Sequence, residues 1–238
     1  QRYSAKKIID LSFKRLQKDP QKALLTTLSF FRNLNVFEDW KFHMAEKKIR
    51  DNDGKWMAFL TDILEKTDEH ILKTTLLNVG YQAAFAGTRY QRQLRNELGT
   101  NLPWTILFDP TSACNLSCVG CWSAEYGHEE NLSYEEMRSI ILQGRELGVY
   151  FYLLTGGEPL VRKKDLAKIF REFDDCGFHL FTNGTLIDED FCDLLKEVGN
   201  VTLSISIEGF EEANDARRGE GSFLKVLEAM KLMQKKRV

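Results

Sequence analysis

The order of hydrophobic and polar positions divides the chain into two parts with different periods. From residue 3 to about residue 99, apolar side chains recur at the spacing of an amphipathic helix. The first two series are Ile9, Phe13 and Leu16, then Leu24, Leu28 and Phe31. Asp19-Pro20 separates these two helices, and Asp53-Gly54 and Gly87 are the breaks expected further along. This pattern predicts an all-α domain of about five helices.

Beyond Pro103 the pattern changes to short apolar runs that are rich in β-branched and aromatic residues. Each of the four runs precedes an amphipathic stretch, so strands are expected to alternate with helices. The runs are residues 105–108, 149–154, 178–181 and 201–207. Ser133 and Glu136 form a capping box, which predicts the start of the first of these helices. Alternation of this kind predicts an α/β fold with parallel strands and right-handed crossovers.

The composition narrows the class of protein. The 238 residues are 43% hydrophobic and 29% charged, with a net charge of −2, so a nucleic-acid partner is not expected. No stretch approaches the roughly 20 apolar residues that span a bilayer, and residues 1–30 lack the order of a signal peptide. A cytoplasmic location follows as the expectation. The chain starts at Gln1 and stops at Val238 directly after a helical pattern, so we expect an excised part of a longer protein.

Unusual residues follow each predicted strand at its carboxyl end. In parallel α/β sheets, ligands bind at this end of the strands, so these residues are expected to share one site. The four groups are the cysteines after the first strand, Gly156-Gly157-Glu158-Pro159, Thr182-Asn183-Gly184, and Ser206 with Glu208-Gly209.

Three of the five cysteines lie within eight residues of one another, which suits ligation better than a disulfide framework. They are Cys114, Cys118 and Cys121, in the spacing C-x3-C-x2-C. Thiolates suit iron–sulfur clusters and zinc alike, and three ligands leave one metal position open for a substrate. The alternatives are a zinc site closed by His128 and an electron-transfer cluster closed by a fourth ligand. Cys176 and Cys192 lie outside this spacing and are expected to be plain buried thiols.

The motifs C-N-L-S-C-V-G-C, G-G-E-P, T-N-G and S-I-S-I-E-G stand in this order after successive strands. This ordered set resembles the radical S-adenosylmethionine (SAM) superfamily, in particular its branch with the molybdenum-cofactor, peptide-modifying and sulfatase-maturing enzymes. The resemblance covers residues 103–238 and does not reach residues 1–100. It implies that residues 101–238 form the first four βα units of a partial barrel of the triosephosphate-isomerase (TIM) type, after a helical domain over residues 1–100.

The resemblance also implies the cofactors. The three cysteines would hold a [4Fe–4S] cluster, whose open iron is chelated by the amino and carboxylate groups of SAM. Reductive cleavage of SAM would give a 5′-deoxyadenosyl radical that abstracts hydrogen from an unidentified substrate, a small molecule or a peptide. Such an oxidoreductase needs a reductant such as flavodoxin or ferredoxin. In this chemistry the cofactor carries the reaction and the protein orients it.

Seven residues match positions that bind SAM in relatives. They are Gly156, Gly157, Glu158, Asn183, Ser206, Glu208 and Arg218. The resemblance sets the first three against the methionine amine, Ser206 and Arg218 against the carboxylate and ribose, and Glu208 near a hydroxyl. Arg217 adjoins Arg218, so which arginine points inward stays open, and Asn183 could equally be a turn residue with positive φ.

One departure from the family pattern affects the adenine contacts. Relatives carry an aromatic residue directly before the third cysteine, where this chain has Gly120, with Trp122 one residue late.

Two other classes of function remain open. One is a methyl transferase, but simple methyl transfer gives a three-cysteine cluster no role. The other is a non-catalytic iron–sulfur or zinc module of a larger assembly. The helical domain could bind a substrate, a partner or a membrane surface.

Overall fold

The computed structural model describes residues 1–16, 18–33, 39–51, 54–123, 127 and 129–238. Every element that it describes before residue 100 is helical. These elements are α1 (Arg2–Leu16), α2 (Pro20–Asn33), α3 (Asp39–Arg50), α4 (Gly54–Lys66), α5 (Glu69–Thr75), η1 (Leu76–Gly87) and α6 (Thr88–Leu98). Within this part of the chain, no helix is both long and apolar enough to cross a membrane, and the same holds for the other described helices.

The second part of the chain forms a four-stranded parallel sheet in the order β1-β2-β3-β4. The strands are β1 (Ile106–Phe108), β2 (Phe151–Leu154), β3 (Gly177–Thr182) and β4 (Val201–Ile205). The helices are α7 (Tyr134–Glu146), η3 (Pro159–Arg162), α8 (Lys163–Glu172), α9 (Glu189–Val198), α10 (Glu211–Arg218) and α11 (Ser222–Lys236). The predicted fold class, four βα units of a partial barrel after an all-α segment, is confirmed.

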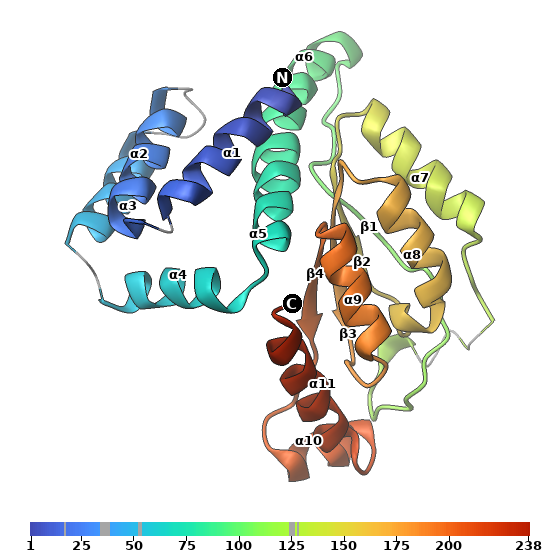
Figure 1. Ribbon diagram of the computed structural model, residues 1–238. Coiled ribbons are helices and arrows are strands. Elements are labelled where there is room, and N and C mark those ends of the chain that lie inside the picture. The colour runs from blue at the N-terminus through green and yellow to red at the C-terminus, as the bar shows by residue number, and fades with distance from the viewer. Residues whose placement is uncertain (17, 34–38, 52–53, 124–126, 128) are drawn as a thin grey trace.

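Helices α7, α8 and α9 lie along one face of the sheet and bury its core (Figure 1). Met137 on α7 and Phe170 on α8 pack with Phe178 of β3 and are inaccessible to water or nearly so. The capping box is present as predicted: Ser133 Oγ accepts from the N–H of Glu136, and the Glu136 carboxylate accepts from the N–H of Ser133. Burial of this one face leaves the alternate strand residues on the opposite face.

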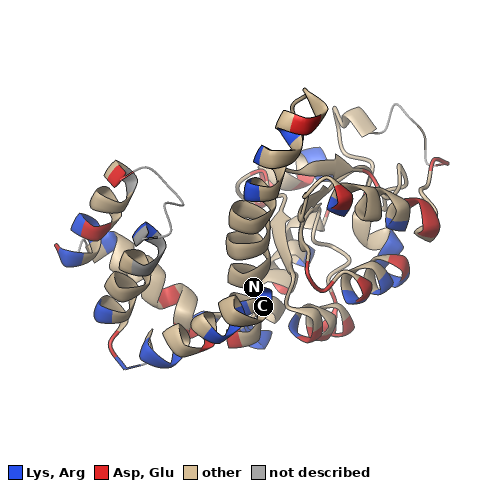
Figure 2. Cartoon of the chain, turned by 90° about the horizontal axis from the view of Figure 1, so that it is seen from above, with Lys and Arg blue, Asp and Glu red and all other residues tan. Residues whose placement is uncertain are grey.

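Residues 69–98 form one continuous helix, since α5, η1 and α6 follow one another without a break. Figure 2 shows this helix between the sheet and the lobe of α1–α4. The expected break at Gly87 is wrong, because Gly87 has right-handed helical φ and ψ angles. A Cβ atom at Gly87 would lie 2.5 Å from the carbonyl oxygen of Gly148. This glycine therefore allows the helix to approach the loop before β2 rather than ending it.

Three polar side chains of this helix meet backbone carbonyl groups that lie shortly before the four strands, in three loops and in the last turn of α9. The contacts are His70 Nε2 to Glu197 O (3.2 Å), Asn78 Nδ2 to Asp174 O (2.8 Å) and Cys176 O (2.9 Å), and Gln91 Nε2 to Pro103 O (2.7 Å) and Leu147 O (3.2 Å). The helix over residues 69–98 thus closes the amino end of the sheet.

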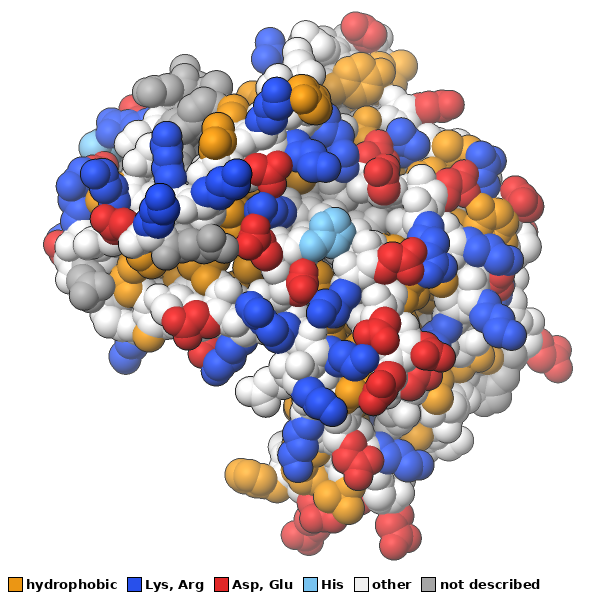
Figure 3. Space-filling view, in the orientation of Figure 1, with side chains coloured by type: hydrophobic (Ala, Val, Ile, Leu, Met, Phe, Trp, Pro, Cys, Tyr) orange, Lys and Arg blue, Asp and Glu red, His pale blue; other side chains and the backbone are white. Residues whose placement is uncertain are grey.

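Helices α1–α4 form a lobe with a small core of Phe13, Leu16 and Ala23. Helix α3 was not predicted from the apolar pattern. Residues 1–66 carry 14 Lys and Arg against nine Asp and Glu, whereas residues 67–238 carry 19 against 26. Figure 3 shows the Lys and Arg side chains more densely placed over this lobe. The domain boundary near residue 100 stays a prediction. The helix over residues 69–98, which precedes this boundary in the chain, packs on the sheet that follows it.

Candidate functional site

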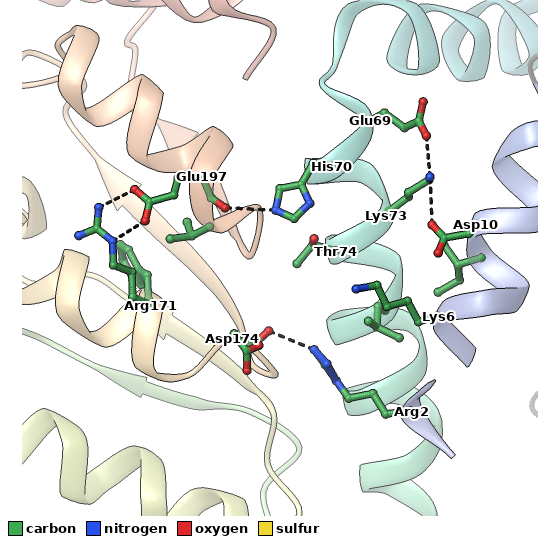
Figure 4. Close-up of a pocket in the computed structure, with 14 residues that line it drawn as sticks. Arg2, Lys6, Asp10, Glu69, His70, Lys73, Thr74, Arg171, Asp174 and Glu197 are labelled. Carbon is green, nitrogen blue, oxygen red and sulfur yellow. Dashed lines mark hydrogen bonds and ion pairs between the residues drawn. The ribbon is translucent and has the colours of Figure 1, made fainter. Parts of the chain in front are cut away.

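A cavity of about 560 Å³ lies at the amino end of the sheet, between α1, α5, α8 and α9. Its charged side chains are largely paired (Figure 4): Lys73 Nζ lies 3.0 Å from Asp10 and 2.6 Å from Glu69, and Arg171 makes two 2.6 Å bonds to Glu197. None of the predicted site residues lines this cavity. The candidate site is therefore at the opposite, carboxyl end, where the cysteines lie.

Cys114, Cys118 and Cys121 lie on the loop after β1, as free and half-buried thiols. The sulfur of Cys114 accepts from the backbone N–H of Leu116 at 3.4 Å, and burial raises the pKa of this thiol. In the described part of the chain, no three His, Cys, Asp or Glu side chains form a group that could hold one metal ion. His128, the candidate fourth zinc ligand, lies outside the described residues.

The glycine pair after β2 packs directly against the backbone that leads into the cysteine loop. Gly157 N donates to Thr111 O at 2.9 Å, and Glu158 N donates to Ala113 O at 2.8 Å. A Cβ atom at Gly157 would lie 2.2 Å from Ala113 O, and Gly156 has φ +106°. Both positions therefore require glycine: one for close approach, the other for its backbone conformation.

The Glu158 side chain is turned into the core, with 0% of the residue exposed. Its carboxylate accepts from Leu160 N at 3.0 Å, Thr182 Oγ1 at 2.7 Å and Asn183 N at 2.7 Å. Burial raises the pKa of Glu158, while these hydrogen bonds oppose the shift. The carboxylate thus joins the loop after β2 to the loop after β3. In this structure it is not accessible to a ligand.

Asn183 continues this connection to the cysteine loop. Its Nδ2 donates to Asn115 Oδ1 at 2.9 Å and lies 3.9 Å from Cys114 Sγ. Its Oδ1 accepts from the N–H of Thr185, as in an Asx turn. The positive φ in this turn belongs to Gly184, at +77°, and not to Asn183. Asn183 is therefore both a turn residue and a neighbour of the first cysteine.

The loop after β4 carries Ser206 directly after the strand and an arginine pair on α10. The Glu208 carboxylate accepts from Arg218 Nη2 at 2.6 Å and from Arg217 Nη1 at 3.0 Å, and the Arg218 hydrogen bond lowers the pKa of Glu208. The Arg218 side chain is 14% exposed and that of Arg217 is 48% exposed, so Arg218 is the inner one. Arg217 O accepts from Val119 N, between the second and third cysteines.

Asp109 belongs to the same edge and was missed in the sequence. It directly follows β1, next to Gly156, and its Oδ1 is buried without a hydrogen-bond partner in the described structure. Burial raises the pKa of its carboxyl group. The sequence contains the signal for this residue. Asp109 is an acidic residue directly after a predicted strand, and ligands bind at the carboxyl ends of parallel strands.

Hydrogen bonds thus connect all four loops at the carboxyl edge of a parallel βα sheet, around a loop with three free thiols. This arrangement defines a barrel-type α/β protein with a thiol-based site at the ligand-binding edge. The family model of the Radical SAM superfamily matches residues 108–238, which is more than half of the chain. The chain belongs to this superfamily.

Individual relatives match the same region. Fe-coproporphyrin III synthase from Methanosarcina barkeri is 37% identical over 123 residues, covering 50% of this chain and 31% of the relative. Mycofactocin maturase MftC from Mycolicibacterium smegmatis is 32% identical over 130 residues, covering 53% and 33%. The structure of native anSMEcpe with bound AdoMet and Cp18Cys peptide matches with a TM-score of 0.50 and 26% identity, covering 56% and 40%. The match spans about a third of the length of these curated relatives.

Proposed function

We propose that this chain is the SAM-cleaving part of a radical SAM enzyme, in which Cys114, Cys118 and Cys121 hold a [4Fe–4S] cluster. The observation that carries the proposal is one loop of three free thiols whose neighbours on the other three loops are hydrogen-bonded to it. When bound, the cluster would supply the electron that breaks the bond between the sulfonium and C5′ of SAM, and so provide the radical that abstracts hydrogen from the substrate.

The donor set fits such a cluster. Each thiolate of a [4Fe–4S] cube binds a different iron atom, so three cysteines on one loop leave a fourth iron open. Cys114 Sγ accepts from Leu116 N and has the Asn183 amide within 3.9 Å. Hydrogen bonds of this kind orient a ligand and stabilise its negative charge. These contacts support Asn183 as a residue that positions the first cysteine.

The remaining predicted residues support a SAM site beside this loop. Arg218 has a buried Nε without a partner, and a ligand carboxylate or hydroxyl would satisfy it. Glu208 holds the other end of that guanidinium and thereby positions it. We assign Ser206 to the same part of SAM, and Gly156 and Gly157 to its methionine amine. Glu158 acts on the amine indirectly, because its carboxylate fixes the loops around the glycine turn.

The substrate is the open part of this proposal. The relatives include a synthase named for a porphyrin product and a maturase, and the solved structure contains a peptide. We therefore keep a small molecule or a peptide as the substrate class, a flavodoxin or ferredoxin as the reductant, and the cytoplasm as the location. The alternative remains a non-catalytic iron–sulfur or zinc module.

Electron paramagnetic resonance (EPR) of the anaerobically reconstituted protein tests the proposal. We expect the spectrum of the reduced cluster to change when SAM is added, because only an open iron can be chelated by its amino and carboxylate groups. 5′-Methylthioadenosine, which lacks both groups, should leave the spectrum unchanged. A cluster whose spectrum ignores SAM would support the electron-transfer module. Tight zinc at one ion per chain, with no iron uptake, would support the zinc module.

A further inference from the structure

Two carboxylates flank the glycine turn after β2, and they differ in what they bind. The carboxylate of Glu158 accepts three hydrogen bonds inside the core. The side chain of Asp109 makes no hydrogen bond or ion pair with any described residue, and its Oδ1 is buried. Of these two carboxylates, only that of Asp109 still needs a donor.

The fold places Asp109 at the ligand-binding edge. Phe108 is buried in the core under the helices, whereas Leu107 is 55% exposed. Because side chains alternate along a strand, Asp109 is expected on the face of Leu107, away from the helices. Its Cβ and Cγ lie 2.8 Å and 3.1 Å from the point where a Cβ of Gly156 would be. The Asp109 side chain therefore lies against the first glycine of the turn.

Asp109 differs from the other side chains that have a buried polar atom without a hydrogen-bond partner. Four described side chains have a buried polar atom without a partner: Arg2, Asp109, Asn200 and Arg218. Arg2, Asn200 and Arg218 form hydrogen bonds through their other atoms. Burial is the one resolved cause of the raised Asp109 pKa, and no cation in the described structure opposes it. A buried carboxylate oxygen without a donor costs free energy, which a donating ligand would recover.

We infer that Asp109 accepts a hydrogen bond from the α-amino group of the SAM methionine moiety, over the Gly156-Gly157 turn. The inference rests on the proposed function, which sets that amine against the same turn. The amine keeps N–H donors whether it is an ammonium or is bound to iron, so the chemistry suits a carboxylate acceptor in both states. Asp109 thus supplies the negative charge for which Glu158 was the expected source.

The test compares two ligands on the reconstituted protein: SAM and its deaminated analogue, in which a hydrogen atom replaces the α-amino group, so that no donor is left at that carbon. Asp109→Asn keeps the shape of the side chain and removes its charge. Asp174→Asn removes the same charge at the amino end of the sheet and is the matched control. Iron content shows whether each variant still loads the cluster, and isothermal titration gives the affinity for each ligand.

We expect Asp109→Asn to load the cluster and to bind SAM about tenfold or more weakly, since a charge-assisted hydrogen bond is lost. Its affinity for the deaminated analogue should fall much less, and Asp174→Asn should match the wild type with both ligands. Unchanged SAM affinity in Asp109→Asn, or equal losses for both ligands, would overturn the inference and leave the proposed function standing. Failure of the cluster-loaded wild type to bind SAM would overturn both.

Discussion

The two ends of the sheet treat their polar groups differently. At the amino end, His70, Asn78 and Gln91 of the long helix meet the carbonyl groups before the four strands. At the carboxyl end, three thiols are free and the Asp109 carboxylate has no partner in the described structure. The first end is closed by side chains of the protein itself, and we propose that the groups at the second end bind a cofactor.

At the carboxyl end, a residue that supports the fold and a residue without a hydrogen-bond partner lie beside the same glycine turn. Glu158 belongs to the motif that marks the site, yet its environment is that of the core. Asp109 lies outside the motif, yet it is the group without a partner. Membership of a motif therefore does not decide whether a side chain meets the ligand or supports the residues that do.

The largest effect expected from this contrast concerns the cysteines. Replacing Cys118 with Ala should abolish cluster loading, from about four irons per chain to almost none, because two thiolates cannot hold the cube. Cys176→Ala is the control, since this thiol is fully buried in the core and burial raises its pKa. Iron and sulfide analysis after anaerobic reconstitution measures both variants. Full loading of Cys118→Ala would disprove the assigned ligand set.

Glu158→Ala tests whether a motif residue supports the fold. The change leaves three buried donors without an acceptor, so the free energy of unfolding should fall by about 3 kcal/mol or more. Glu228→Ala, on the exposed side of α11, should change it by less than about 0.5 kcal/mol. Urea unfolding of the two variants provides the comparison. Equal stabilities would mean that the Glu158 carboxylate is not needed by the core.

A pair of glycines on one helix sharpens the account of the amino end. Gly87→Ala should cost about 1–3 kcal/mol, because its Cβ would lie 2.5 Å from a backbone oxygen of the loop before β2. Gly80→Ala has nothing within 4 Å and should stabilise the protein by about 0.4–1 kcal/mol, as alanine favours the helix. Thermal unfolding distinguishes the two. Similar effects at both positions would contradict the close contact between helix and sheet.

The smallest expected effect is a pH dependence at Asp109. The raised pKa of Asp109 means that the folded state favours the protonated acid. This group therefore stabilises the fold when the pH lies below the usual pKa of an aspartic acid, near 3.8. That contribution is lost as pH rises through the folded pKa. Without ligand, Asp109→Asn should therefore be more stable than the wild type at neutral pH, by about 0.5 kcal/mol at most, because solvent screens a partly open carboxyl. The difference should vanish under acid; a constant difference would exclude titration of Asp109 as its source.

The sequence predicted the elements that depend on local patterns. The four apolar runs placed the strands to within a few residues, and Ser133 with Glu136 placed the start of α7. Both signals lie within a few neighbouring positions. Helix α10 was not predicted, since residues 211–218 are mostly polar and have no apolar period to detect.

Long-range contacts were beyond the sequence. Asn78 meets carbonyl groups 96 and 98 residues away, and no local pattern shows that its helix packs on the sheet. The same holds for Gly87, where a residue that often ends helices serves close packing. At the site, the motifs predicted which loops meet, and hydrogen bonds connect them. The direction of the Glu158 carboxylate depends on Thr182 and Asn183, two side chains of another loop.

The central claim is that three cysteines leave one iron open and that SAM occupies it. Mössbauer spectroscopy of the protein reconstituted with iron-57 tests this most directly, because it resolves individual iron sites. We predict that adding SAM separates the signal into a three-to-one pattern, in which the minor iron shows the higher coordination expected from chelation by nitrogen and oxygen. Four irons that remain alike in the presence of saturating SAM would contradict the claim.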